Sequence, residues 1–151
     1  MITIKNTQRE YPIDTIALER KITIVLNAVG YPDYDLNIWF STNSTIKKYN
    51  KQFRGKDAVT DVISFPYYET KTPGKLPKAS KMEPTLGDIM LSPGYIAKDL
   101  INWPGQKLEE RIVLLVVHSI CHLLGYDHDK DGDYEVMVKE EQRLLKLLLP
   151  N

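Results

Sequence analysis

The sequence predicts an α+β fold, in which a small mixed four-stranded sheet packs with about five helices around one central helix. Short segments of alternating apolar and polar residues indicate strands, and longer segments with capping residues indicate helices. The two kinds of element alternate irregularly and without internal repeats, which favours α+β over a regularly alternating fold. Residues 112–124 are apolar nearly all round, so the helix that contains them must be buried at the centre.

Four segments have the pattern of strands. Ile2 and Ile4 alternate with polar residues, and Leu36, Ile38 and Phe40 form a second alternating segment. Two further apolar segments are short enough to be strands, and proline follows the first of them. The predicted strands are 2–6, 36–40, 62–65 and 89–91.

Five segments have the pattern of helices, and most carry a start or stop signal. Asp14 can cap the first and Gly30 can end it, while Ser92 followed by Pro93 is typical of a helix start. Gly125 should end the central helix. The predicted helices are 15–28, 42–51, 93–101, 106–124 and 134–149. Residues 66–84 hold four prolines, and we expect a long mobile loop there.

Composition restricts the class of protein. With 151 residues, 42% of them hydrophobic and 26% charged, the chain has the profile of one soluble domain spanning residues 1–151. Its 20 basic and 20 acidic residues cancel, which excludes a wholly basic nucleic-acid coat. The single cysteine suits a reducing compartment, and no signal-peptide core or long apolar run is present. We therefore expect a cytoplasmic protein without a membrane span.

All three histidines lie in the segment HSICHLLGYDH at 118–128. His118 and His122 are four residues apart on a predicted helix, so their side chains point the same way, roughly 6 Å apart. On a continuous helix His128 would lie about 15 Å from His118. Gly125 can adopt a positive φ and turn the chain back. We therefore predict one metal ion bound by His118, His122 and His128, which makes the central helix metal-bearing.

Three protein ligands with an open fourth position are typical of catalytic zinc, so we expect one Zn²⁺ per chain. Zinc lowers the pKa of its bound water to about 7 and supplies hydroxide at neutral pH. The alternative is a set of buried histidines without a metal, each of which would need a hydrogen-bond partner.

Two other functions are compatible with parts of this segment. The spacing H-x-x-x-H-x-x-G-x-x-H also occurs in metzincin proteases, which makes a metalloprotease an alternative. Those enzymes carry a glutamate base after the first histidine, where this chain has Ser119. A calcium loop is a weaker alternative. Asp127, Asp129 and Asp131 match the start of an EF-hand, but Val138 occupies the position that requires glutamate.

A basic segment, KKYNKQFRGK at 47–56, has five positive charges and no acid. Such a strip can bind a phosphate backbone, and Tyr49 or Phe53 could stack on bases. Arg54 is the catalytic candidate, because a guanidinium can bind two phosphate oxygens and oppose charge in the transition state. A solvated helix face, or an ion pair of Arg54 with a nearby aspartate, is the alternative. The substrate-binding candidates are Lys47, Lys48, Lys51 and Lys56.

Other catalytic chemistries find little support. The chain has no G-x-S-x-G elbow, no Walker loop and no G-x-G-x-x-G motif. Cys121 follows His118 by three residues and faces a different direction from His122, so we expect a packed thiol rather than a ligand.

Three blocks resemble the YbeY family of single-strand-specific metallo-endoribonucleases, also called rRNA maturation factors. They are HSICHLLGYDH at 118–128, RGKDAVTDVISF at 54–65 and LGDIMLS at 86–92, in the family's order. The resemblance extends over nearly the whole chain. The chain departs from the usual pattern at Ser119, Cys121 and Val59, none of which is a ligand position.

The resemblance implies zinc bound by His118, His122 and His128, with Arg54 as the essential arginine. It implies cleavage of single-stranded RNA, processing of the 3′ end of small-subunit rRNA, and ribosome quality control. Small-subunit ribosomal proteins and an assembly GTPase are the implied partners. A non-catalytic, zinc-bearing ribosome assembly factor is the remaining alternative. No residue of the chain is an evident general base.

Overall fold

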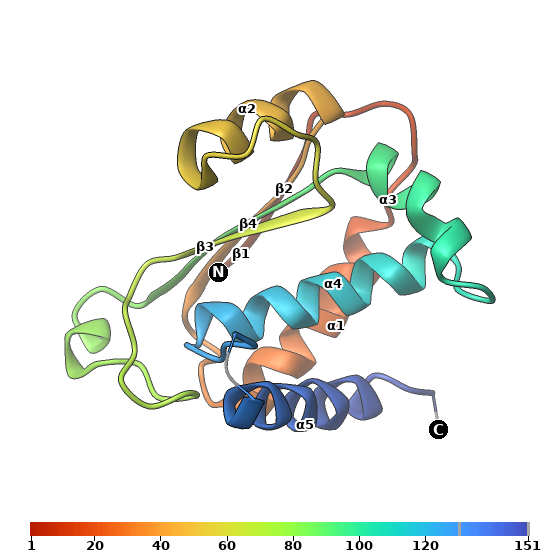
Figure 1. The fold of residues 1–151 in the computed structure, drawn as a ribbon. Helices are drawn as coiled ribbons and strands as arrows, with labels where there is room; N and C mark the ends of the chain where they lie inside the picture. The colour runs from red at the N-terminus through yellow and green to blue at the C-terminus, as the bar shows by residue number, and fades with distance from the viewer. Residues whose placement is uncertain (130, 151) are drawn as a thin grey trace.

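The computed structural model describes residues 1–129 and 131–150, and these contain one four-stranded sheet between two layers of helices. Helix α2 covers one face of the sheet, whereas α1 and α4 cover the other, with α5 packed outside them (Figure 1). This α+β arrangement with five α-helices and a central α4 agrees with the prediction. The helices are α1 (Thr15–Val29), α2 (Asn43–Arg54), α3 (Pro93–Asp99), α4 (Leu108–Leu123) and α5 (Asp131–Leu147).

The sheet is mixed, with the strand order β1-β2-β4-β3. Strands β1, β2 and β4 run parallel, and β3 pairs antiparallel with β4 at one edge. Pro66 is the last residue of β3 instead of the residue after it, which an edge strand permits. The strands are β1 (Ile2–Asn6), β2 (Asp35–Phe40), β3 (Val62–Pro66) and β4 (Thr85–Leu91).

The alternation along β2 decides which side chains face which helical layer. Leu36, Ile38 and Phe40 are fully buried in the main core with α1 and α4. Trp39 points to the opposite face, where it packs on a smaller core around Ile46 of α2. The sheet therefore supports α2 on one side and α4 on the other, and both helices carry predicted site residues.

The ends of the helices follow local capping rules, with small shifts from the predicted limits. Asp14 accepts a hydrogen bond from the amide of Ala17 and caps α1. Gly55, at φ 69°, ends α2 at Arg54, three residues later than predicted. Helix α4 begins at Leu108 instead of residue 106, and α5 begins at Asp131 instead of residue 134.

The middle of the chain confirms one prediction and corrects another. Ser92 is the N-cap residue of α3 with Pro93 at the first helical position, as predicted, but its hydroxyl bonds to Asn43 and not to a helix amide. Residues 66–84 do not form a free loop. The amide of Gly74 donates to the carbonyl of Leu124, and the amide of Leu76 donates to the Tyr31 hydroxyl. These contacts attach the segment, which includes the 3₁₀ turn Lys78–Lys81, to the body of the protein.

No helix within the described residues has both the length and the apolar character to span a bilayer.

Candidate active site

Helix α4 carries His118 and His122 on one face, at the edge of the main core. Its buried side includes Leu115, Val116 and Ile120, which fix the helix against the sheet. The two imidazoles are one turn apart, and their Nε2 atoms are 3.0 Å from each other. Local helix geometry therefore brings the first two predicted ligands together.

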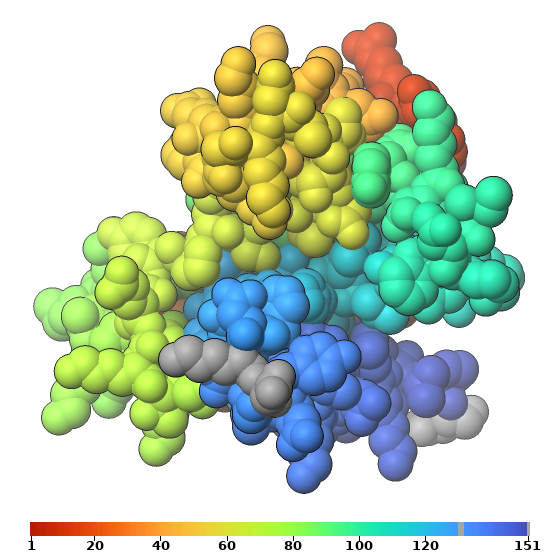
Figure 2. Space-filling model, in the orientation of Figure 1, coloured from red at the N-terminus to blue at the C-terminus, as the bar shows by residue number. Residues whose placement is uncertain are grey.

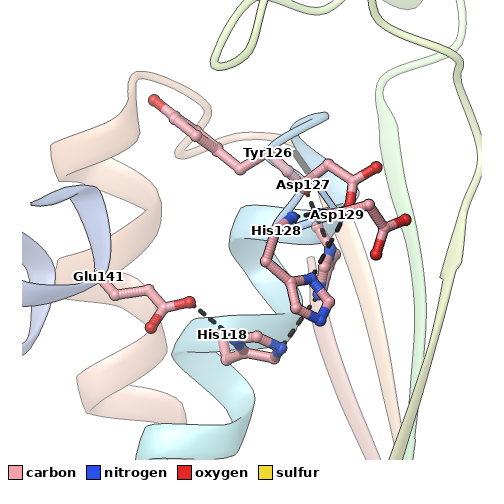
Figure 3. A network of polar contacts seen from close by, with 7 residues as sticks. His118, Tyr126, Asp127, His128, Asp129 and Glu141 are labelled. Atoms are coloured by element: carbon pink, nitrogen blue, oxygen red, sulfur yellow. Dashed lines mark hydrogen bonds and ion pairs between the residues drawn. The ribbon is translucent and has the colours of Figure 1, made fainter. Parts of the chain in front are cut away.

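Hydrogen bonds to the opposite ring nitrogens fix the tautomers of both histidines. The Nδ1 atom of His118 is 2.7 Å from a carboxylate oxygen of Glu141, and that of His122 is 3.0 Å from the carbonyl oxygen of Tyr126. Figure 3 shows Glu141 pointing from α5 towards His118. Both partners are acceptors, so each Nδ1 donates its proton and each Nε2 is the ring nitrogen that can bind a cation.

Two Nε2 atoms at this separation share either a proton or a metal cation, because two bare lone pairs would repel each other. Two nitrogens on one tetrahedral zinc ion at 2.0–2.1 Å would be about 3.3 Å apart, close to the separation seen. A histidine ligand usually donates its other N–H to a carboxylate or carbonyl, as both do here. The donor set therefore fits a bound metal ion.

Burial also favours the metal-binding form of His122. Removal from water, together with the neighbouring His118, lowers the pKa of His122 below the usual value, although the Tyr126 carbonyl acts in the opposite direction. The ring is therefore neutral at physiological pH, and its lone pair is available to a cation.

Gly125 turns the chain so that His128 comes back towards α4. Its φ is 90°, and its amide donates to the carbonyl of His122. The ring centroid of His128 is then 5.8 Å from that of His118 and 5.2 Å from that of His122. A Cβ at position 125 would overlap the Thr70 side chain, so this position requires glycine for space as well as for φ.

The loop after Gly125 brings His128 together with two carboxylates. Possible ligand atoms of Asp127, His128 and Asp129 all lie within 4.8 Å of one another. Burial alone would raise the pKa of Asp127, but the backbone amides of Asp129 and His128 donate to it and lower that pKa below its usual value. This loop can therefore offer a cation His128 or one of two exposed carboxylates.

A cleft of about 1180 Å³ contains all three histidines together with Arg54 and Lys56. In Figure 2 the yellow segment around these two basic residues lies above the light-blue end of α4 on the same face. Among the described residues Arg54 makes no ion pair. The two aspartates nearby in the sequence have other partners, since Asp57 lies 4.0 Å from Lys51 and Asp61 accepts from the amide of Val62. The Arg54 guanidinium is therefore available to a ligand.

The other predicted lysines lie away from the cleft. Lys47, Lys48 and Lys51 are exposed on α2 and do not line it. Only Lys56, which follows the turn at Gly55, reaches the wall of the cleft. The reason is the helical period, since α2 directs Ile46 and Asn50 inward and the three lysines to solvent.

Cys121 is a packed thiol, as predicted. Its side chain is fully buried in the main core, and burial strongly raises the pKa of the thiol. It therefore stays protonated and makes no part of the metal site.

Sequence reasoning missed Glu141, Trp103 and Arg111. Glu141 lies 23 residues after His118 on a helix that also carries Glu135 and Glu140, so the sequence does not distinguish the one that reaches the imidazole. Trp103 and Arg111 line the same cleft. In the sequence, only Arg111 could have been found, because it lies seven residues before His118 and therefore on the same face of the helix. No sequence pattern indicated Trp103.

The structure contradicts the calcium-loop alternative. An EF-hand loop starting at Asp127 would need to remain non-helical well past Asp131. Instead α5 begins at Asp131, and Val138 lies inside this helix.

Comparison with known proteins agrees with this geometry. The family model of Endoribonuclease YbeY matches residues 3–149. The chain belongs to the Endoribonuclease YbeY family. The family gives the chain the role of an endoribonuclease, which favours RNA over protein as the material cleaved.

Curated relatives match over most of both chains. A human protein named Endoribonuclease YbeY is 31% identical over 95% of this chain and 86% of its own length. One from Geobacter metallireducens is 32% identical over 97% and 95%, and one from Aquifex aeolicus is 34% identical over 92% and 85%. A solution structure of a Thermotoga maritima protein has the same fold, with a TM-score of 0.65 and 24% identity over 97% of this chain and 88% of that chain.

Proposed function

We propose that this endoribonuclease cleaves single-stranded RNA with one zinc ion bound by His118, His122 and His128. The observation that carries the proposal is the pair of Nε2 atoms, 3.0 Å apart, in a cleft that also contains Arg54. His128 is the third ligand from the loop, with Asp127 and Asp129 as the alternative oxygen donors nearby.

When bound, zinc supplies a Lewis acid and a source of hydroxide at neutral pH. The residues of the chain do the rest. Glu141 and the Tyr126 carbonyl hold His118 and His122 in the ligand tautomer. Arg54 binds the non-bridging phosphate oxygens and stabilises the negative charge that develops on them in the transition state. Lys56 attracts the backbone from the same wall of the cleft.

The resemblance supports a finer assignment of substrate and partners. We propose that the RNA is ribosomal, that the cleavage matures the 3′ end of the small-subunit rRNA, and that the protein contributes to ribosome quality control. Small-subunit ribosomal proteins and an assembly GTPase are the proposed partners, in the cytoplasm. Lys47, Lys48 and Lys51 are exposed on α2, and we propose that they contact RNA outside the cleft.

The test is an RNA cleavage assay with single-stranded and duplex substrates, with chelator and with zinc added back, alongside elemental analysis. We expect chelation to abolish cleavage of the single strand and zinc to restore it. Arg54→Ala should keep its metal and lose about 10²- to 10³-fold in rate, whereas Arg20→Ala, an exposed arginine of α1, should change neither.

Full activity of the Arg54→Ala protein would refute the role of the arginine. A chelated protein that cuts at an unchanged rate would refute the metal. A zinc-loaded protein that binds RNA without cutting it would favour the assembly-factor alternative, and cleavage of an unstructured protein would favour the protease. Products with a 2′,3′-cyclic phosphate would show attack by the ribose hydroxyl, and their absence would indicate attack by water.

A further inference from the structure

Arg111 is a buried cation that the proposed mechanism does not use. Only 7% of its surface is exposed, although it lines the same cleft as the histidines. The described residues place no carboxylate within 4.0 Å of its guanidinium and give its side chain no hydrogen bond. Asp99 acts on this guanidinium only at longer range, where Arg111 is the last of the influences that lower the pKa of Asp99. A guanidinium so withdrawn from water without a directly bound anion costs folding free energy, so its position needs a reason.

Trp103 holds this guanidinium in one place. The Arg111 Cζ atom lies 3.7 Å from the centroid of the indole, in a cation–π contact. The indole N–H in turn donates to Asp99, at 3.1 Å, which also accepts from the Asn102 amide. Asp99 is therefore occupied with positioning Trp103. The stacked guanidinium keeps its N–H edge for a ligand.

The position of Arg111 on α4 relates it to the metal site. It precedes His118 by seven residues, which places both side chains within about 20° on one helix face and roughly 10 Å apart along the axis. Leu114 and Leu115 line the cleft between them. The cleft therefore has a metal site at one end, an apolar floor and an unpaired cation at the other end.

Gln106 adds a second unsatisfied group at the Arg111 end. It lines the same cleft, and its side-chain oxygen is buried without a hydrogen-bond partner among the described residues. A buried amide oxygen without a partner is uncommon in folded proteins and needs a ligand or water. Arg111 and Gln106 thus both line the cleft with polar atoms that form no hydrogen bond within the described residues.

We infer that Arg111, stacked on Trp103, binds a backbone phosphate of the RNA strand next to the cleavage site, with Gln106 contacting the adjoining nucleotide. This inference rests on the proposed function. It defines the path of the RNA strand, which follows α4 from the histidines towards the start of the helix. A guanidinium already fixed by an aromatic ring loses little entropy when it binds two phosphate oxygens.

The experiment measures binding, not cutting, with 2′-O-methyl RNA that resists attack through the ribose hydroxyl. The zinc-loaded protein is titrated with a labelled hexanucleotide and a labelled dinucleotide at several salt concentrations. Arg111→Met removes the charge and keeps an apolar stem against Trp103. Arg20→Met, on exposed α1, is the matched control.

We expect Arg111→Met to weaken the hexanucleotide about 10- to 100-fold and to leave the dinucleotide unchanged, since one phosphodiester cannot reach both ends. The slope of log K against log salt should become shallower by about 0.7, the value for one phosphate of a single strand. Arg20→Met should change neither. Arg111→Lys, which keeps a charge but not the fork, should give an intermediate loss, and it replaces Arg111→Met if that variant does not fold.

Equal loss for both oligonucleotides, loss of zinc, or an unchanged hexanucleotide affinity in a folded variant would overturn the inference. Failure of the proposed function is distinguished by cleavage, because the zinc-loaded wild-type protein would then not cut single-stranded RNA, whatever its affinity for the hexanucleotide.

Discussion

The histidines of α4 and the histidine of the following loop are supported in different ways. His118 and His122 come from a buried helix, and each has a hydrogen-bond partner on its second ring nitrogen. His128 comes from an exposed loop, and its side chain is half exposed, with Asp127 as its neighbour at 3.7 Å. In the proposed zinc site, the helix therefore supplies two histidines whose side chains are already held in place, whereas the loop supplies a third whose position a bound metal would help to fix.

Removal of a histidine should have the largest effect on zinc binding. Its effect on stability should differ between the helix histidines and the loop histidine. We expect His118→Ala, His122→Ala and His128→Ala each to weaken zinc binding by more than the 100-fold that loss of a supporting partner causes. In chelator, only the helix variants should also lose stability. For His118→Ala the loss is about 1–3 kcal/mol, because Glu141 is left unpaired in a partly buried position. Elemental analysis and thermal denaturation measure both effects. Equal stability losses for His118→Ala and His128→Ala would contradict the distinction.

Gly125→Ala tests the turn that connects α4 to the loop carrying His128. The substitution combines a φ of 90° with a clash against Thr70, so we expect a loss of about 3 kcal/mol and displacement of His128. Denaturant unfolding and zinc titration measure these effects. Thr70→Gly in the same chain should recover the part due to the clash and leave the part due to φ. No recovery would show that space is not the constraint.

Glu141→Gln tests the support of the helix side. The amide keeps the size of the side chain but not the charge that favours the ligand form of His118, so zinc affinity should fall about 10- to 100-fold. Glu135→Gln, on an exposed face of α5, is the matched control and should bind zinc normally. If both variants bind alike, Glu141 does not support the site.

Asp127→Asn tests the support of the loop side and should have a smaller effect, about tenfold at most in zinc affinity. The carboxylate accepts from two backbone amides, and its pKa is lower in the folded protein than in the unfolded chain. Its contribution is therefore present at neutral pH and disappears as the pH falls below about 4. Zinc titration at pH 7 measures the effect. A loss as large as that of Glu141→Gln would remove the contrast between loop and helix.

Chemical labelling of Cys121 should show the smallest effect of all. Because burial raises the pKa of its thiol, a thiol reagent at neutral pH should leave the folded protein unmodified and react only after denaturation. Rapid labelling of the native protein would mean that α4 opens locally and is less rigid than the structure indicates.

Local rules explain how much the sequence alone determined. Alternation gave the strands, capping residues gave the helix ends to within a few residues, and a four-residue spacing on a helix placed His118 beside His122. Gly125 indicated that the chain turns, because few other residues adopt its φ. The resemblance to a nuclease family also came from short blocks of sequence, two of which contain Arg54 and the three histidines.

Only the tertiary structure decided which distant side chains complete the site. Glu141 reaches His118 because α5 packs on α4, and nothing local separates it from its neighbouring glutamates. The packing of β3, α2 and α4 brings Arg54 and Lys56 to the histidines and leaves the other lysines outside. Arg111 and Trp103 are only eight residues apart, and the turn before α4 brings the indole against the guanidinium. Periodicity determines which face of a helix or strand is buried. Contacts between elements depend on how those faces pack together, and local sequence patterns do not determine that packing.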